Sequence, residues 1–180
     1  MSDSFNWNVE WEVHKYKTDT ADDVRQNKIE PYEVLNKKGN LLMYKGASSM
    51  WEYMLGNGTT SAGSALAYFN NSNSRIVVGT STISVGGLQT DLQSGTATYS
   101  RAIGTMEATY PQHLNVNDAA AGTVTFKSIY GPGVAEFDWN EWGIFNGTAA
   151  TSTMLNRKQE YLGTKQGGET WTLLVNIRLS

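Results

Sequence analysis

The fold is decided by residues 137–180, which read FDWNEWGIFNGTAATSTMLNRKQEYLGTKQGGETWTLLVNIRLS. Apolar and polar residues alternate here, most clearly at the end, where one face holds Trp171, Leu173, Val175, Ile177 and Leu179. Successive side chains of a β-strand point to opposite faces of a sheet, so a period of two makes one face apolar. The pattern predicts strands at 137–145, 154–162 and 171–180, which form the hydrophobic centre of one β domain.

One charged residue lies among the apolar residues of these strands. Glu141 is expected to share a face with Phe137 and Trp139. A buried carboxylate has to be paired, so we predict an ion pair or hydrogen bonds with Arg157 or Lys158 on the adjacent strand. The expected structural core comprises Trp51, Phe126, Phe137, Trp139, Glu141, Phe145, Trp171, Leu173, Val175 and Ile177.

Further short strands are predicted upstream of this block, at 65–69, 75–79, 99–110 and 123–130. The turn Gly131-Pro132-Gly133 predicts a hairpin between the strands at 123–130 and 137–145. About eight short strands with turn signals at regular spacing indicate a mainly β, antiparallel single domain. We expect a sandwich, or a jelly-roll or β-barrel-like arrangement.

One α-helix is predicted at about 41–55. Its apolar stripe consists of four residues spaced by four positions, Leu42, Gly46, Met50 and Met54. Gly56 follows directly, where a left-handed C-terminal cap is favoured. We expect Trp51 and Met54 to pack against a sheet, and a methionine-rich docking groove is the alternative.

The first residues form an amphipathic strand of their own, in which Phe5, Trp7, Val9, Trp11 and Val13 alternate with polar residues. A polar connector follows, with a short helical turn expected from Ala21 to Asn27. A terminal strand pairs either with the sheet of its own chain or with the sheet edge of a neighbour. We therefore divide the chain into an extended N-terminal arm and connector, 1–39, and an antiparallel β domain, 40–180.

Composition limits the classes of function. The chain has 180 residues, 14 Lys and Arg against 17 Asp and Glu, and no Cys. A net charge of −3 without a basic cluster argues against nucleic-acid binding, and the absence of Cys excludes disulfides and thiolate metal sites. The N-terminus shows no signal peptide pattern, and no apolar run approaches the roughly 20 residues of a membrane span. We expect a soluble protein with neither membrane nor nucleic acid as partner.

The residues that could carry catalysis are few. His14 and His113 are the two histidines, and neither has a recognisable nucleophile or acid partner in the sequence. Two groups of carboxylates occur on strands, Glu10 with Glu12 and Glu136 with Asp138 and Glu141. A solvated strand face explains both groups, and a glycosidase pair built on Glu136 or Glu141 is the weaker alternative. We predict no enzyme, no catalytic residue, no cofactor and no metal site.

The C-terminal block carries a resemblance. The segments Phe137–Asn146, Met154–Arg157, Leu162–Lys165 and Thr170–Leu173 look like a stretch that recurs in virion structural proteins of tailed bacteriophages. Gly79–Ser81, Asp91–Leu92 and Thr109–Pro111 fit the same pattern, so the resemblance covers roughly residues 40–180. It carries no catalytic signature. Proteins of this kind include capsid decoration (cement) proteins and small tail or fibre components.

The resemblance implies a protein of the virion that is assembled in the host bacterial cytoplasm. The leading expectation is a cement protein on the outer surface of the mature head, with the major capsid protein as partner and a homo-oligomer, such as a trimer, as its own state. Residues 5–13 would then extend along a neighbouring subunit and bury Trp7 and Trp11 there. The alternative is a tail-fibre or baseplate module that binds a glycan or another tail protein.

Overall fold

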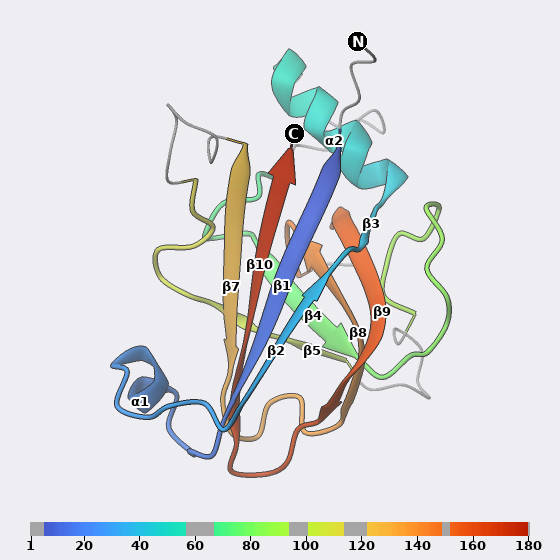
Figure 1. The fold of residues 1–180 in the computed structure, drawn as a ribbon. Helices are drawn as coiled ribbons and strands as arrows, with labels where there is room; N and C mark the ends of the chain where they lie inside the picture. Colours follow the sequence, from blue (N-terminus) through green and yellow to red (C-terminus); the bar gives the residue numbers. More distant parts are fainter. Residues whose placement is uncertain (1–5, 57–66, 94–100, 114–121, 149–151, 180) are drawn as a thin grey trace.

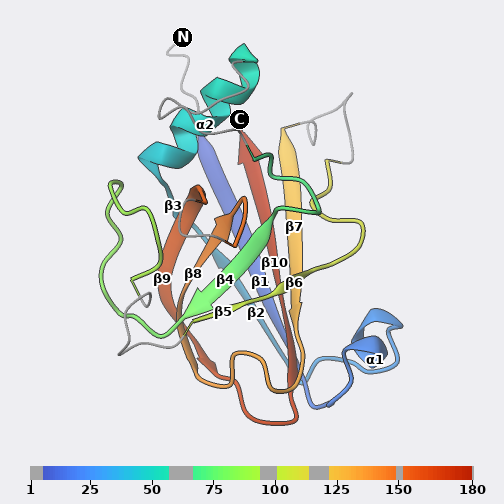
Figure 2. The same cartoon turned by 180° about the vertical axis from the view of Figure 1, so that it is seen from behind.

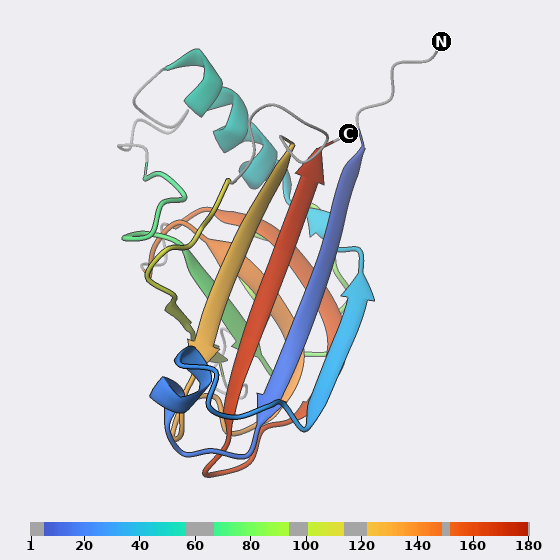
Figure 3. The same cartoon turned by 60° about the vertical axis from the view of Figure 1, so that its left-hand side comes forward.

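The chain folds as two antiparallel five-stranded sheets packed face to face (Figures 1 and 3). A computed structural model describes residues 6–56, 67–93, 101–113, 122–148 and 152–179. Of the predicted alternatives, the antiparallel sandwich is the one found. The predicted strand at 65–69 lies partly outside the described residues, and residues 67–69 are not in a strand.

The two sheets draw on both ends of the chain. Sheet A has the order β2-β1-β10-β7-β6 and sheet B the order β3-β9-β8-β4-β5. Sheet A consists of β1 (Trp7–Tyr16), β2 (Glu33–Lys38), β6 (Thr105–Met106), β7 (Thr123–Tyr130) and β10 (Thr170–Leu179). Sheet B consists of β3 (Leu41–Leu42), β4 (Arg75–Gly79), β5 (Arg101–Ile103), β8 (Asp138–Phe145) and β9 (Met154–Thr164). Helices α1 (Ala21–Arg25) and α2 (Tyr44–Leu55) lie at opposite ends of the sandwich (Figure 1).

The core between the sheets is built on aromatic rings. Four tryptophans are buried there, Trp11, Trp139, Trp142 and Trp171. The ring of Trp139 meets those of Tyr130 and Trp171 edge to face, at centroid distances of 4.6 and 4.9 Å, a geometry that aromatic quadrupoles favour. Of the other expected core residues, Phe126, Leu173, Val175 and Ile177 are buried here and Phe137 is half-buried.

The side chains of β8 do not alternate regularly between the two faces of sheet B. Its register with β9 shifts between Trp139 and Glu141, and Trp139 and Trp142, three positions apart, both enter the core between the sheets. Phe145 instead joins a second cluster with Val77 and Leu92. The prediction that Trp139 and Phe145 share a face is therefore wrong, because the irregular pairing breaks the period of two.

Two predicted connections also differ from the structure. The turn at 131–133 does not close a hairpin, because β7 pairs within sheet A and β8 within sheet B. The predicted strand at 99–110 is divided at Gly104 into β5 of sheet B and β6 of sheet A. A Cβ at Gly104 would come within 2.5 Å of the Tyr130 ring, so only glycine lets the chain cross between the sheets this close to that ring.

Helix α2 ends as the sequence predicts, but Trp51 and Met54, expected to pack against a sheet, face solvent. Gly56 is its left-handed C-cap, with φ 67°. Its buried side carries Gly46 and Ser49, and a Cβ at Gly46 would lie 2.4 Å from the carbonyl oxygen of Leu155. The small residue lets the helix backbone approach β9 and fixes which side packs. Trp51, predicted in the core, is instead 63% exposed.

The N-terminal strand belongs to the sandwich. β1 pairs with β10 over its whole length and with β2 on its other side. Val9, Trp11 and Val13 lie in the core, and Trp7 packs against it; Phe5 lies outside the described residues. The predicted arm interface with a neighbour is thus corrected: of the two fates of a terminal strand, pairing within the chain is the one found, and 7–38 supply two strands of sheet A.

Candidate functional site

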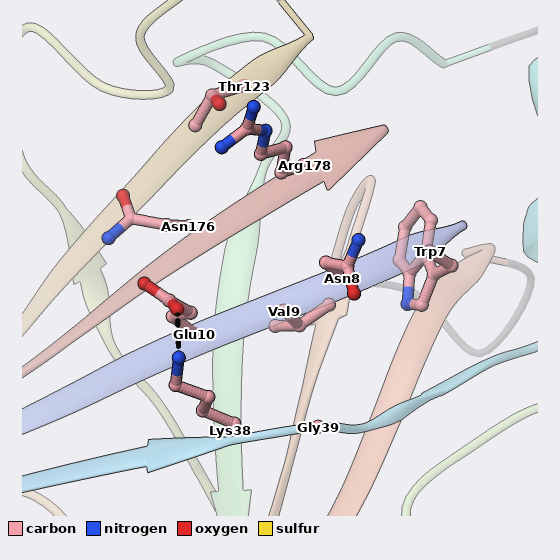
Figure 4. Close-up of a pocket in the computed structure, with 9 residues that line it drawn as sticks. All are labelled: Trp7, Asn8, Val9, Glu10, Lys38, Gly39, Thr123, Asn176 and Arg178. Atoms are coloured by element: carbon pink, nitrogen blue, oxygen red, sulfur yellow. Dashed lines mark ion pairs between the residues drawn. The ribbon is translucent and has the colours of Figure 1, made fainter. Parts of the chain in front are cut away.

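A polar groove of about 770 Å³ lies on the outer face of sheet A (Figure 4). Strand alternation produces it, because the residues between the core residues of β1 and β10 point outward. Register then brings these residues together, with Asn8 opposite Arg178 and Glu10 opposite Asn176. The lining residues are Trp7, Asn8, Val9, Glu10, Lys38, Gly39, Thr123, Asn176 and Arg178.

Charges of both signs line this groove, one acidic residue and two basic residues. Glu10 and Lys38 form an ion pair of 2.6 Å, and the hydrogen bond and charge of Lys38 lower the pKa of the Glu10 carboxyl. The Thr125 hydroxyl donates to Oδ1 of Asn176 over 2.7 Å, which orients the amide. Interleaved donors and acceptors on rigid strands suit a ligand rich in hydroxyl groups better than a polyanion.

The solvent side of α2 carries a second notable surface. Tyr44, Trp51 and Leu55 are 67%, 63% and 71% exposed, and their spacing of seven and four positions places them on one stripe of the helix. Leu88, 83% exposed, follows Gly87, whose carbonyl accepts a hydrogen bond from the Tyr44 amide. We call these four residues the α2 apolar stripe. The sequence pattern missed it because Trp51 was assigned to the core.

The predicted pairing of Glu141 is confirmed. Nη2 of Arg157 lies 2.6 Å from Oε2 of Glu141, and both side chains are fully buried. Both residues contact the segment 80–93, which lies against sheet B, the sheet in front in Figure 2.

Arg157 and Glu141 also hold that segment in place. The Arg157 guanidinium donates to the carbonyl oxygens of Ile83 and Ser84 and to the side chain of Gln89. The backbone N–H of Gln93 in turn donates to Oε2 of Glu141. The pair thus fastens 80–93 over the sheet, and the cluster of Phe145 and Leu92 lies on the same face. Its contacts are those of a structural ion pair.

Of the other candidate catalytic residues, His14 and Glu12 contact each other, and Glu136 and Asp138 make separate contacts. His14 contacts Glu12 at 2.8 Å on the outer face of β1, whereas Glu136 is exposed and accepts a hydrogen bond from the Gly133 amide. Asp138 accepts one from the Thr164 hydroxyl. Within the described ranges, no three His, Asp or Glu side chains cluster as a metal site would require.

Neither described helix has the length and apolar character needed to span a bilayer. The groove on sheet A was missed by sequence reasoning, although the polar members of the alternating strands signalled an outward face. Which of them meet depends on the pairing of the two ends of the chain, and no local pattern gives that register.

Comparisons of this chain with protein-family models, with curated proteins and with solved structures find no match.

Proposed function

We propose that this protein is a non-enzymatic structural component of a tailed-phage virion, a cement protein that binds the outer surface of the mature head. The resemblance of 137–173 to virion structural proteins supports this proposal. The observation that carries it furthest is the α2 apolar stripe, with Tyr44, Trp51, Leu55 and Leu88 all more than half exposed. Grouped exposed apolar side chains of this kind mark protein–protein contact surfaces.

The mode of binding differs from the one expected from the sequence. Trp11 and Val13 are held in the core, so β1 is not available to extend along a neighbour. The folded domain would instead dock α2 and Leu88 on the major capsid protein. Each large apolar side chain removed from water contributes roughly 1.5–3 kcal/mol. Repetition of the contact around a symmetric shell, or within a homo-oligomer, adds avidity.

Cosedimentation with heads that lack the protein tests the docking surface. We expect the double variant Trp51→Ser, Leu55→Ser to bind heads at least about tenfold more weakly, because the contact loses two apolar anchors. The matched control is Tyr161→Ser, which removes an aromatic side chain that is 60% exposed on β9. Unchanged binding by the double variant, with a normal melting curve, would reject α2 as the docking surface.

Copy number tests the assignment to the head. Quantitative mass spectrometry of purified particles should give a ratio to the major capsid subunit near one, or a simple fraction of it. A handful of copies per particle would move the protein to the tail. Absence from particles would refute the virion assignment altogether.

The groove on sheet A favours a second candidate, a tail-fibre or baseplate module that binds a host surface glycan. Planar amide and guanidinium groups from Asn176 and Arg178 can make paired hydrogen bonds to sugar hydroxyls. Binding of purified host surface polysaccharide, measured by calorimetry, should then be lost in Arg178→Ala and kept in Lys28→Ala, which alters an exposed lysine near α1. Equal binding of the polysaccharide by both variants would exclude the groove as the glycan-binding site.

A further inference from the structure

A pocket of about 240 Å³ opens between sheet A and α2 (Figure 3 shows this end of the sandwich). Sheet A contributes its inward side chains at this end, and α2, β9 and the segment before β4 contribute the opposite wall. The lining residues are Trp7, Met50, Tyr53, Phe69, Gly122, Val124, Phe126, Leu155, Ile177 and Leu179. None of these side chains carries a charge.

Two lining side chains, Tyr53 and Trp7, carry polar atoms that could bind water. These atoms already form hydrogen bonds with residues outside the pocket lining. The Tyr53 hydroxyl donates to the carbonyl oxygen of Ala67 over 2.7 Å and accepts from Nδ2 of Asn146 over 3.2 Å. Nε1 of Trp7 donates to Oδ1 of Asn40 over 2.8 Å. A water molecule needs two to four polar partners to be held in a cavity. The lining side chains offer it none, and the wall is one of carbon atoms and the Met50 sulfur.

We propose that this pocket is a binding site for a small uncharged apolar molecule, aromatic or aliphatic. The apolar lining supports this, since a closed cavity of about 150 Å³ lined by Leu, Ile and Phe binds benzene. The pocket here is lined in the same way but is open to solvent on one side. The pocket is larger, at about 240 Å³. Met50 adds a deformable thioether and Phe69 an aromatic wall, which adapt to ligand shape. The inference is independent of the proposed role in the virion.

Benzene is the probe for the test, added to the full-length protein and followed by methyl NMR. We expect saturable shifts of the Val124, Leu155 and Ile177 methyl signals and a rise in melting temperature with benzene concentration, because a ligand of the folded state stabilises it. Val124→Phe fills the pocket and should weaken binding at least tenfold, about 1.4 kcal/mol. Val34→Phe, on the exposed face of β2, is the matched control and should bind as the parent protein does.

Three results would overturn the proposal. One is the absence of saturable shifts, and another is benzene binding by Val124→Phe equal to that of the parent. A third is a set of shifts confined to the Leu55 and Leu88 methyl signals, which would place the probe on the α2 apolar stripe. If Val124→Phe does not fold, Leu179→Phe at the half-buried end of β10 makes the same test.

Discussion

At the scale of single residues, the buried guanidinium of Arg157 has the largest expected effect on stability. Arg157→Met would remove the counter-charge of Glu141 in a fully buried site, where both side chains have no exposed surface. Removing one partner of a buried ion pair costs about 3–5 kcal/mol. We expect a loss of that order in the free energy of unfolding, measured by urea denaturation.

Lys158→Met is the control for this prediction. Lys158 follows Arg157 directly and pairs with Glu160 at 3.2 Å, with its side chain partly exposed. Solvent-exposed ion pairs contribute about 0–1 kcal/mol, so this variant should lose little. A similar stability for both variants would show that Arg157 does not hold Glu141 and the segment 80–93 in place.

Tyr32 gives a prediction for alkaline pH. Burial, together with the hydrogen bond to Glu169 and its negative charge, raises the pKa of the Tyr32 phenol from 10.0 to about 12. Because the folded state holds this proton more tightly, the stabilisation is complete below pH 10 and is lost as the pH rises from about 10 to about 12. Phenol titration by NMR, assigned with Tyr32→Phe, checks the value.

Glu169→Gln should bring the pKa of Tyr32 down toward 10, since the variant removes the charge that disfavours the tyrosinate. The parent protein should also lose stability more steeply than Tyr32→Phe over this pH range. A pKa near 10 for Tyr32 in the parent protein would contradict the contact with Glu169.

At the scale of elements, the packing of α2 depends on Gly46. Exchange of glycine for alanine inside a helix normally stabilises it by about 1 kcal/mol. Here the new Cβ would lie 2.4 Å from the Leu155 carbonyl oxygen, and overpacking costs about 1–3 kcal/mol. The clash is with backbone, which cannot rotate away, so we expect Gly46→Ala to destabilise the protein by about 1–2 kcal/mol. Thermal and urea unfolding measure this change.

Ser48→Ala separates packing from helix propensity, because Ser48 is exposed on the same helix. It should leave stability unchanged or raise it by a few tenths of a kcal/mol. If Gly46→Ala stabilised the protein as much as Ser48→Ala did, close contact between α2 and β9 would be refuted.

At the scale of the whole molecule, the two ends of the chain depend on each other. β1 lies between β2 and β10 in sheet A, and Trp11 and Val13 are buried between the sheets. Deleting residues 1–16 would expose an unpaired edge of β10 and remove part of the core. We expect the truncated chain to lose its cooperative thermal transition, measured by circular dichroism. A truncated chain that melts cooperatively near the melting temperature of the full protein would show that residues 1–16 are not needed for the fold of the β domain.

The amino-acid sequence alone predicts the mainly β class, the bounds of β4, β7, β8, β9 and β10 within two residues, the C-cap of α2 and the pairing of Glu141. These follow from local rules: side-chain alternation, the φ that glycine tolerates, and the need of a buried carboxylate for a partner. β4 and β7 begin and end where the pattern predicts.

Tertiary packing sets which strands share a sheet and leaves Trp51 and Met54 of α2 in solvent. The turn at 131–133 crosses between the sheets, and Gly46 rather than Trp51 faces β9. The groove on sheet A and the pocket beneath α2 likewise combine residues from opposite ends of the chain. Such contacts depend on register and close packing between distant segments, and local hydrophobic patterns carry no information about either.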